Sequence, residues 1–122
     1  MALVHPAQLT LQALRPTVPG HAVILTLLSE IGDPVAWEHG SAHILHVISA
    51  MGLATRMLDG EPVPLRALLD QLRRMDLEGQ RMKAALQEGP GAGTPEAERL
   101  LQIGARTTAA EELLLRCLGL KQ

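Results

Sequence analysis

Apolar residues recur at helical spacing through most of the chain, and Pro and Gly residues mark where each helical segment begins and ends. An apolar residue every three or four positions places one face of a helix against a core. The pattern predicts helices over residues 21–31, 34–58, 64–88 and 95–118, with a short helix over 6–14 before them. We therefore expect an all-α fold.

Residue types that cap helices stand at the ends of the predicted segments. Asp33 and Pro34 favour a helix start, because an Asp side chain accepts hydrogen bonds from free backbone N–H groups and Pro is pre-set for the first helical position. Asp59-Gly60 favours a helix end. Thr94-Pro95-Glu96 is a second start signal, which opens the last predicted helix.

The two longest predicted helices are joined by a short segment, residues 59–64, that contains two prolines. A connection this short favours antiparallel neighbours. We therefore expect a central antiparallel helical hairpin over residues 34–88. The Gly-rich segment 89–93 predicts a flexible linker between this hairpin and the last helix.

Each long helix carries an apolar line in which steps of three and four alternate, as in helices that pack at shallow angles. In the 64–88 helix the line has one gap, at Gly79, and it consists of Leu65, Leu68, Leu72, Met75, Gly79, Met82 and Leu86. In the 34–58 helix it consists of Trp37, Ser41, Ile44, Ile48, Met51, Thr55 and Leu58. A looser line in the last helix consists of Leu100, Ile103, Thr107, Ala110, Leu114 and Cys117.

The 34–58 helix carries a second line, on roughly the opposite face, formed by His39, His43, His46, Ala50, Leu53 and Met57. In an isolated helical hairpin each helix packs through one face only, so two such lines on one helix are not needed. We expect the second line to meet the N-terminal segments, the last helix or a second copy of the chain. The sequence thus predicts a helical bundle built on the central hairpin and completed by dimerisation, as a homodimer.

Composition narrows the classes of protein that this chain can belong to. Its 122 residues suit a single domain, 1–122, and 47% hydrophobic with 20% charged residues favours a folded chain. The net charge of −2 shows no basic excess, and Trp37 is the only aromatic residue. We therefore expect no nucleic-acid partner and no attraction to anionic membranes.

The cysteine content and the hydropathy of the chain predict a cytoplasmic protein. Cys117 is the only cysteine, so no internal disulfide or cysteine-pair metal site can form. The first residues lack the basic and then apolar order of a signal peptide, and no apolar run approaches the length of a membrane span. We expect a soluble protein without a cofactor.

Three histidines on one helical face, His39, His43 and His46, are the only concentrated chemistry in the sequence. One interpretation is structural: imidazoles can line a helix interface, form hydrogen bonds across it and titrate near neutrality. Such an interface would loosen at mildly acidic pH.

A second interpretation is a metal site that uses His39, His43 and His46. Imidazole is a good ligand for zinc, copper or nickel, and two histidines four residues apart can share one ion. No carboxylate at a supporting position accompanies them, because Glu38 points away from the histidine line.

A third interpretation comes from the residues that follow His39, which lies near the start of its predicted helix. Leu45 follows it after six residues and Ile48 after nine. This spacing resembles the phosphoacceptor region of histidine-kinase dimerisation domains, helical hairpins that dimerise into four-helix bundles. The resemblance implies that His39 is the phosphoacceptor.

The same comparison limits what the chain can do. Gly40 stands where that family has an acidic residue or Arg beside the phosphoacceptor. The chain has no room for an ATP-binding domain and no Gly-rich phosphate loop. The resemblance therefore implies a phosphotransfer protein that exchanges phosphate with the Asp of a response regulator, and not a kinase.

Taken together, the sequence favours a small cytosolic interaction or dimerisation module with a regulatory, non-enzymatic role. Histidine phosphotransfer through His39 is the alternative, and metal binding by the histidine cluster is the third hypothesis.

Overall fold

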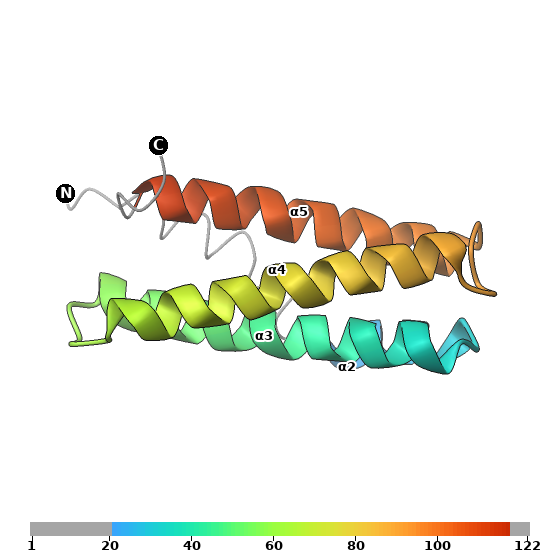
Figure 1. The fold of residues 1–122 in the computed structure, drawn as a ribbon, viewed down its shortest axis with the longest axis horizontal. Helices are drawn as coiled ribbons and strands as arrows, with labels where there is room; N and C mark the ends of the chain where they lie inside the picture. Colours follow the sequence, from blue (N-terminus) through green and yellow to red (C-terminus); the bar gives the residue numbers. More distant parts are fainter. Residues whose placement is uncertain (1–20, 118–122) are drawn as a thin grey trace.

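Every described element of the chain is a helix, as the sequence predicts. The structure, a computed structural model, describes residues 21–117. Its helices are α2 (His21–Glu30), α3 (Pro34–Leu58), α4 (Leu65–Glu88) and α5 (Pro95–Cys117), shown in Figure 1. The short helix predicted over 6–14 lies outside the described residues, and so does Leu118.

The predicted caps define the helix ends. The Asp33 side chain accepts a hydrogen bond from the Val35 N–H at 3.0 Å, with Pro34 as the first helical residue. Gly60 ends α3 with a φ of 83°, a left-handed conformation that Gly adopts without steric cost. The Thr94 hydroxyl accepts a hydrogen bond from the Ala97 N–H at 3.2 Å and so caps α5.

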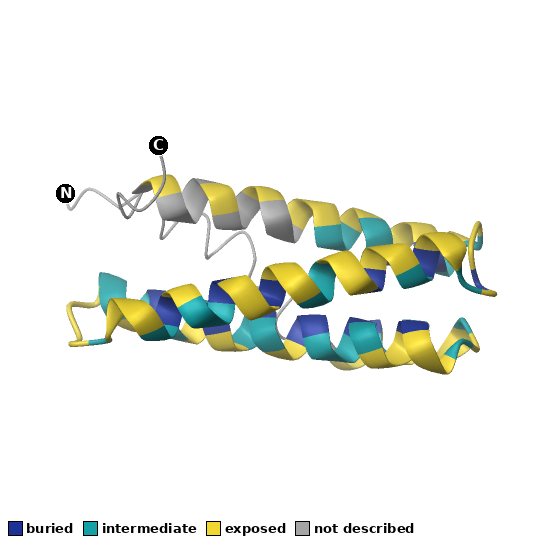
Figure 2. Cartoon of the chain, viewed as in Figure 1, coloured by how far each residue is buried: buried dark blue, intermediate teal, exposed yellow. Residues whose placement is uncertain are grey.

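Helices α3 and α4 lie side by side and antiparallel along their length (Figure 1). Their buried residues face each other across the hairpin (Figure 2). Near the 59–64 connection the core of described residues consists of the α3 and α4 side chains Val47, Ala50, Ala54, Leu68, Leu72 and Met75.

At the other end of the hairpin, α2 and α5 add to the core. Leu28 of α2 is fully buried and lies directly over Gly40 of α3, where a Cβ would overlap the Leu28 side chain. The core at this end consists of Ile24, Leu28, Ala36, Ile44, Met82, Leu86, Ala97 and Leu100. The absence of a side chain at Gly40 therefore allows α2 to pack closely on α3.

The buried face of α3 differs from the face that the apolar pattern predicts. It runs between the two predicted lines and consists of Ala36, Gly40, His43, Ile44, Val47, Ala50 and Ala54. Trp37 of the first line is 41% exposed. The cause is the small residues of α3, since Ala and Gly let neighbouring helices approach closely while adding little to an apolar pattern.

The segment 89–93, predicted to be a flexible linker, forms hydrogen-bonded turns. The Ala92 N–H donates to the Gly89 carbonyl at 3.0 Å, and the Thr94 N–H donates to the Gly91 carbonyl at 3.2 Å. Gly91 is buried against Ile31, at the connection between α2 and α3. The segment thus packs on another part of the chain, and its flexibility stays a prediction.

Within residues 21–117, no helix combines the length and the apolar character that crossing a membrane would need. The apolar line of α5 is described only in its first part, where Leu100 is buried and Ile103 is half-buried.

Candidate functional site

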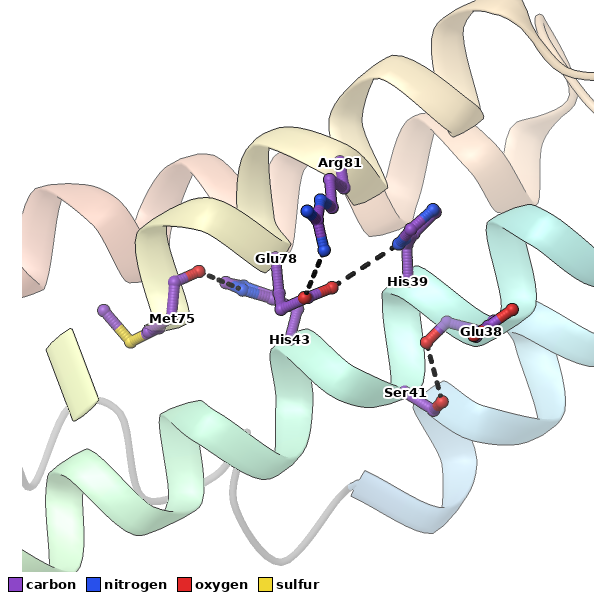
Figure 3. A network of polar contacts seen from close by, with 7 residues as sticks. All are labelled: Glu38, His39, Ser41, His43, Met75, Glu78 and Arg81. Atoms are coloured by element: carbon purple, nitrogen blue, oxygen red, sulfur yellow. Dashed lines mark hydrogen bonds and ion pairs between the residues drawn. The ribbon is translucent and has the colours of Figure 1, made fainter. Parts of the chain in front are cut away.

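The three histidines of α3 all face α4, and each one contacts a different residue of that helix through its Nδ1 atom. The pairs are His39 with the Glu78 carboxylate at 3.4 Å, His43 with the Met75 carbonyl at 3.1 Å, and His46 with the Gln71 amide oxygen at 3.1 Å. We call this set of contacts the histidine ladder. It runs across the middle of the hairpin, and Figure 3 shows two of its pairs.

The spacing of the ladder follows from the antiparallel register. Along α3 the histidines are separated by four and then three residues. Along α4 their partners are separated by three and then four residues, in the opposite chain direction. Since residues at these spacings share one helix face, each histidine meets a new residue of α4 about one helical turn further on.

The line of histidines was expected to meet an element outside the hairpin, and the structure places it against α4 instead. The reason is on α4: a Cβ added at Gly79 would lie 3.0 Å from Cε1 and 3.1 Å from Nδ1 of His43. The missing side chain at Gly79 therefore makes room for the imidazole of His43. The gap that Gly79 leaves in the apolar line of α4 is thus filled by the His43 side chain of α3.

His43 is the buried centre of the ladder, with 3% of its surface exposed. A carbonyl oxygen only accepts hydrogen bonds, so the contact with Met75 requires the proton on Nδ1. Nε2 is then unprotonated and carries a lone pair. This buried atom has no hydrogen-bond partner among the described residues. The ring thus holds a free acceptor atom inside the protein.

Burial also lowers the pKa of His43 below its ordinary value, because the charged ring would lose its hydration. The hydrogen bond to Met75 and the carboxylates of Asp76 and Glu78 act in the opposite direction, and His46 adds to the lowering. Burial is the largest of these effects. His43 is therefore neutral at neutral pH.

His39 lies nearer to solvent and is paired with a carboxylate. Its Nδ1 donates to one oxygen of Glu78, and the other oxygen accepts a hydrogen bond from Nη1 of Arg81 at 2.9 Å (Figure 3). Because the proton is held on Nδ1, Nε2 of the neutral ring keeps its lone pair. A carboxylate that fixes the tautomer of an imidazole also stabilises positive charge that develops on the ring.

The sequence did not identify the α4 residues of the site. Glu78, Arg81 and Gln71 are polar residues of a salt-bridged helix face when they are considered alone. An antiparallel register with His43 opposite Met75 is the signal that would have found them, because it brings Glu78 near His39 and Gln71 near His46.

The structure does not gather His39, His43 and His46 around one point. They are successive pairs of the ladder, and each ring is oriented by its own partner on α4. Among the residues that the structure describes, no three His, Cys, Asp or Glu side chains lie where they could hold one metal ion. The predicted set of three metal ligands is therefore not assembled in residues 21–117.

Comparisons with known proteins give no match: none of the protein-family models, curated proteins or solved structures resembles this chain significantly. The site is therefore interpreted from its own geometry.

Proposed function

We propose that this chain is a small helical interaction module that associates with a second copy of itself and has a regulatory, non-enzymatic role. The observation that carries the proposal is a group of large apolar side chains left exposed on adjacent helices. Val23 of α2 is 65% exposed, and Trp37 and Leu45 of α3 are 41% and 62% exposed.

Val23 and Leu45 lie at one level of the molecule, and Trp37 lies about two helical turns from Leu45 on α3. Leu28 packs on Gly40 in the antiparallel pair α2–α3, and the same register places Val23 at the level of Leu45. Single exposed apolar residues are common on protein surfaces, but neighbouring ones mark contact surfaces. Trp is also among the residues most enriched at the centres of protein interfaces.

A second copy of the chain is the occupant that we favour. The net charge is only −2, so two copies repel each other weakly. The exposed Val23, Trp37 and Leu45 side chains offer the apolar surface that a second copy would cover.

The test is the mass of the full chain in solution, measured by sedimentation or light scattering. We expect a homodimer that Leu45→Lys converts to a monomer. Leu77→Lys is the matched control, because Leu77 is also exposed, at 47%, but lies on α4. A monomeric parent chain, or equal effects of the two substitutions, would contradict the proposal.

The second candidate function is phosphotransfer through His39, and the pairing with Glu78 favours it. The family that the sequence resembles has an acidic residue or Arg next to the phosphoacceptor, where this chain has Gly40. Here Glu78 of the neighbouring helix contacts Nδ1 of His39. A carboxylate from the other arm of the hairpin can thus replace the missing neighbour.

In this function the Nε2 lone pair of His39 attacks the phosphorus atom of an aspartyl phosphate on a response regulator. An N–P bond forms while the P–O bond to the Asp carboxylate breaks, and that carboxylate leaves with the electron pair. The Nδ1 proton stays on the ring, and Glu78 stabilises the positive charge that develops there.

Phosphorylation is tested by incubating the chain with phosphoramidate, a small phosphoryl donor, and with a phosphorylated response-regulator receiver domain. We expect an acid-labile phosphate that is absent from His39→Ala, retained by His46→Ala and formed at least about tenfold more slowly by Glu78→Gln. Equal labelling of the two histidine variants would exclude this function.

A further inference from the structure

A cavity of about 420 Å³ lies between the neighbouring helices α4 and α5 (Figure 1). Small residues of α5 leave this space, since Gly104 has no side chain and Ala105 has only a methyl group. Met75, Met82 and Leu101 supply an apolar wall. The volume is within the range of small-molecule sites in proteins.

One edge of the cavity is polar and consists of exposed residues of α4. Asp76, Gln80, Lys83 and Gln87 follow one another at steps of four, three and four residues, so they share one helix face. His43 also lines the cavity, but its Nε2 is buried. The polar contacts of a bound molecule therefore come from the exposed edge of α4.

The two charged residues of this edge are not paired with each other or with another described residue. No ion pair among the described residues includes Asp76 or Lys83. Seven positions separate them, so their Cα atoms lie about 10 Å apart along the helix axis. The cavity thus has a negative charge towards one end, a positive charge towards the other, and an apolar wall between them.

We propose that the cavity binds a short apolar peptide with free termini, whose ammonium group pairs with Asp76 and whose carboxylate pairs with Lys83. An extended peptide of about three residues spans the distance between the two charges. Gln80 lies between them on the same edge, and its amide group can both donate to and accept from a peptide bond. A fatty carboxylate fits less well, because it would use Lys83 and leave its methyl end beside a carboxylate.

The probe is the tripeptide alanyl-leucyl-alanine, added to the full chain while the methyl resonances of Met75 and Met82 are followed by NMR. Two blocked forms of the probe each lack one charge: the N-acetyl form has no ammonium group, and the C-terminal amide has no carboxylate. An exposed ion pair changes affinity by up to about fivefold. We expect each blocked form to bind about threefold to fivefold more weakly than the free tripeptide.

Two variants assign each terminus of the probe to its partner. Asp76→Asn should abolish the preference for the free ammonium group and retain the preference for the carboxylate, and Lys83→Gln should do the reverse. Glu88→Gln and Arg73→Gln are the matched controls, because they neutralise charges of α4 outside the cavity, and they should retain both preferences.

A third variant tests the location of the site. Ala105 is exposed and lines the cavity, so Ala105→Trp should obstruct it and weaken the binding of all three forms of the probe. Melting curves of the variants establish that they are folded. Unchanged binding to Ala105→Trp would place the peptide elsewhere and overturn the proposal.

Three further outcomes would overturn it: no saturable binding of the tripeptide, equal affinities for the free and blocked forms, or octanoate binding as tightly as the tripeptide. The same holds if both preferences survive in Asp76→Asn and Lys83→Gln. The site is separate from the exposed residues proposed for dimerisation and from His39, so this inference and the proposed function succeed or fail independently.

Discussion

At the scale of single residues, the imidazole of His43 occupies the space that a side chain at position 79 would fill. The ring is held on one side by the Met75 carbonyl and is almost completely enclosed. Packing and protonation are therefore linked at this position, since a charged ring would need water that the site does not admit.

Folding stability should fall as the pH drops below about 6.5, the ordinary pKa of a histidine. Burial lowers the pKa of His43 in the folded chain, so the unfolded chain binds the proton at a higher pH. One such group changes the free energy of unfolding by at most about 1.4 kcal/mol per pH unit. Urea unfolding at about pH 7.5 and about pH 5.5 measures the loss.

The control is the same comparison in His43→Leu, where the acid-dependent loss should be smaller because the buried titrating group is gone. His46→Leu should keep most of the loss. If the parent chain were more stable at the lower pH, or if all three chains responded alike, the pH dependence would have another origin.

A side chain at position 79 should conflict with this ring. Gly79→Ala gains up to about 1 kcal/mol of helix propensity but forces His43 to move, which costs about 1–3 kcal/mol in a packed core. We expect net destabilisation, measured by thermal or urea unfolding. In a His43→Ala background the same substitution should stabilise the chain, and additive effects of the two changes would refute the contact.

At the scale of the helices, close packing depends on where small residues lie. The strength of the apolar pattern identified the segments that form α3 and α4, and the caps at Asp33, Gly60 and Thr94 set both ends of α3 and the start of α5 to within about a residue. The pattern did not identify which face of α3 is buried. Ala36, Gly40 and Ala54 are buried because small residues let the neighbouring helices approach closely, and such residues contribute little to an apolar pattern.

Two glycines of α3 should respond in opposite ways to substitution by Ala. At Gly40 a Cβ would overlap the fully buried Leu28, so Gly40→Ala should destabilise the chain by about 1–3 kcal/mol and loosen α2. At Gly52 nothing lies within 4 Å, so Gly52→Ala should stabilise it by up to about 1 kcal/mol. Urea unfolding measures the stability change in both variants, and amide hydrogen exchange measures the loosening of α2. Similar stability changes in the two variants would contradict this packing.

At the scale of the whole molecule, the core of the described residues falls into two clusters. One consists of α3 and α4 side chains, and the other also includes side chains of α2 and α5. Large apolar residues of α2 and α3 remain exposed. This exposure is consistent with a chain whose stability depends on association, as we propose.

A dimer of this kind predicts a melting temperature that rises with chain concentration, because binding of the folded copies stabilises them by mass action. Melting curves recorded over about a hundredfold range of concentration measure the effect. The rise should be absent from Leu45→Lys and present in Leu77→Lys. A melting temperature that does not depend on concentration in the parent chain would indicate a monomer.

The sequence by itself determined the helices, because helix periodicity, caps and breakers are properties of neighbouring residues. It also determined that three histidines share one face of α3. Only the tertiary structure decided what that face meets: Glu78, Met75 and Gln71 are separated from their histidines by 25 to 39 residues of chain. The free Nε2 of His43 and the cavity beside it arise from the packing of α3, α4 and α5, and no local pattern encodes the space between helices.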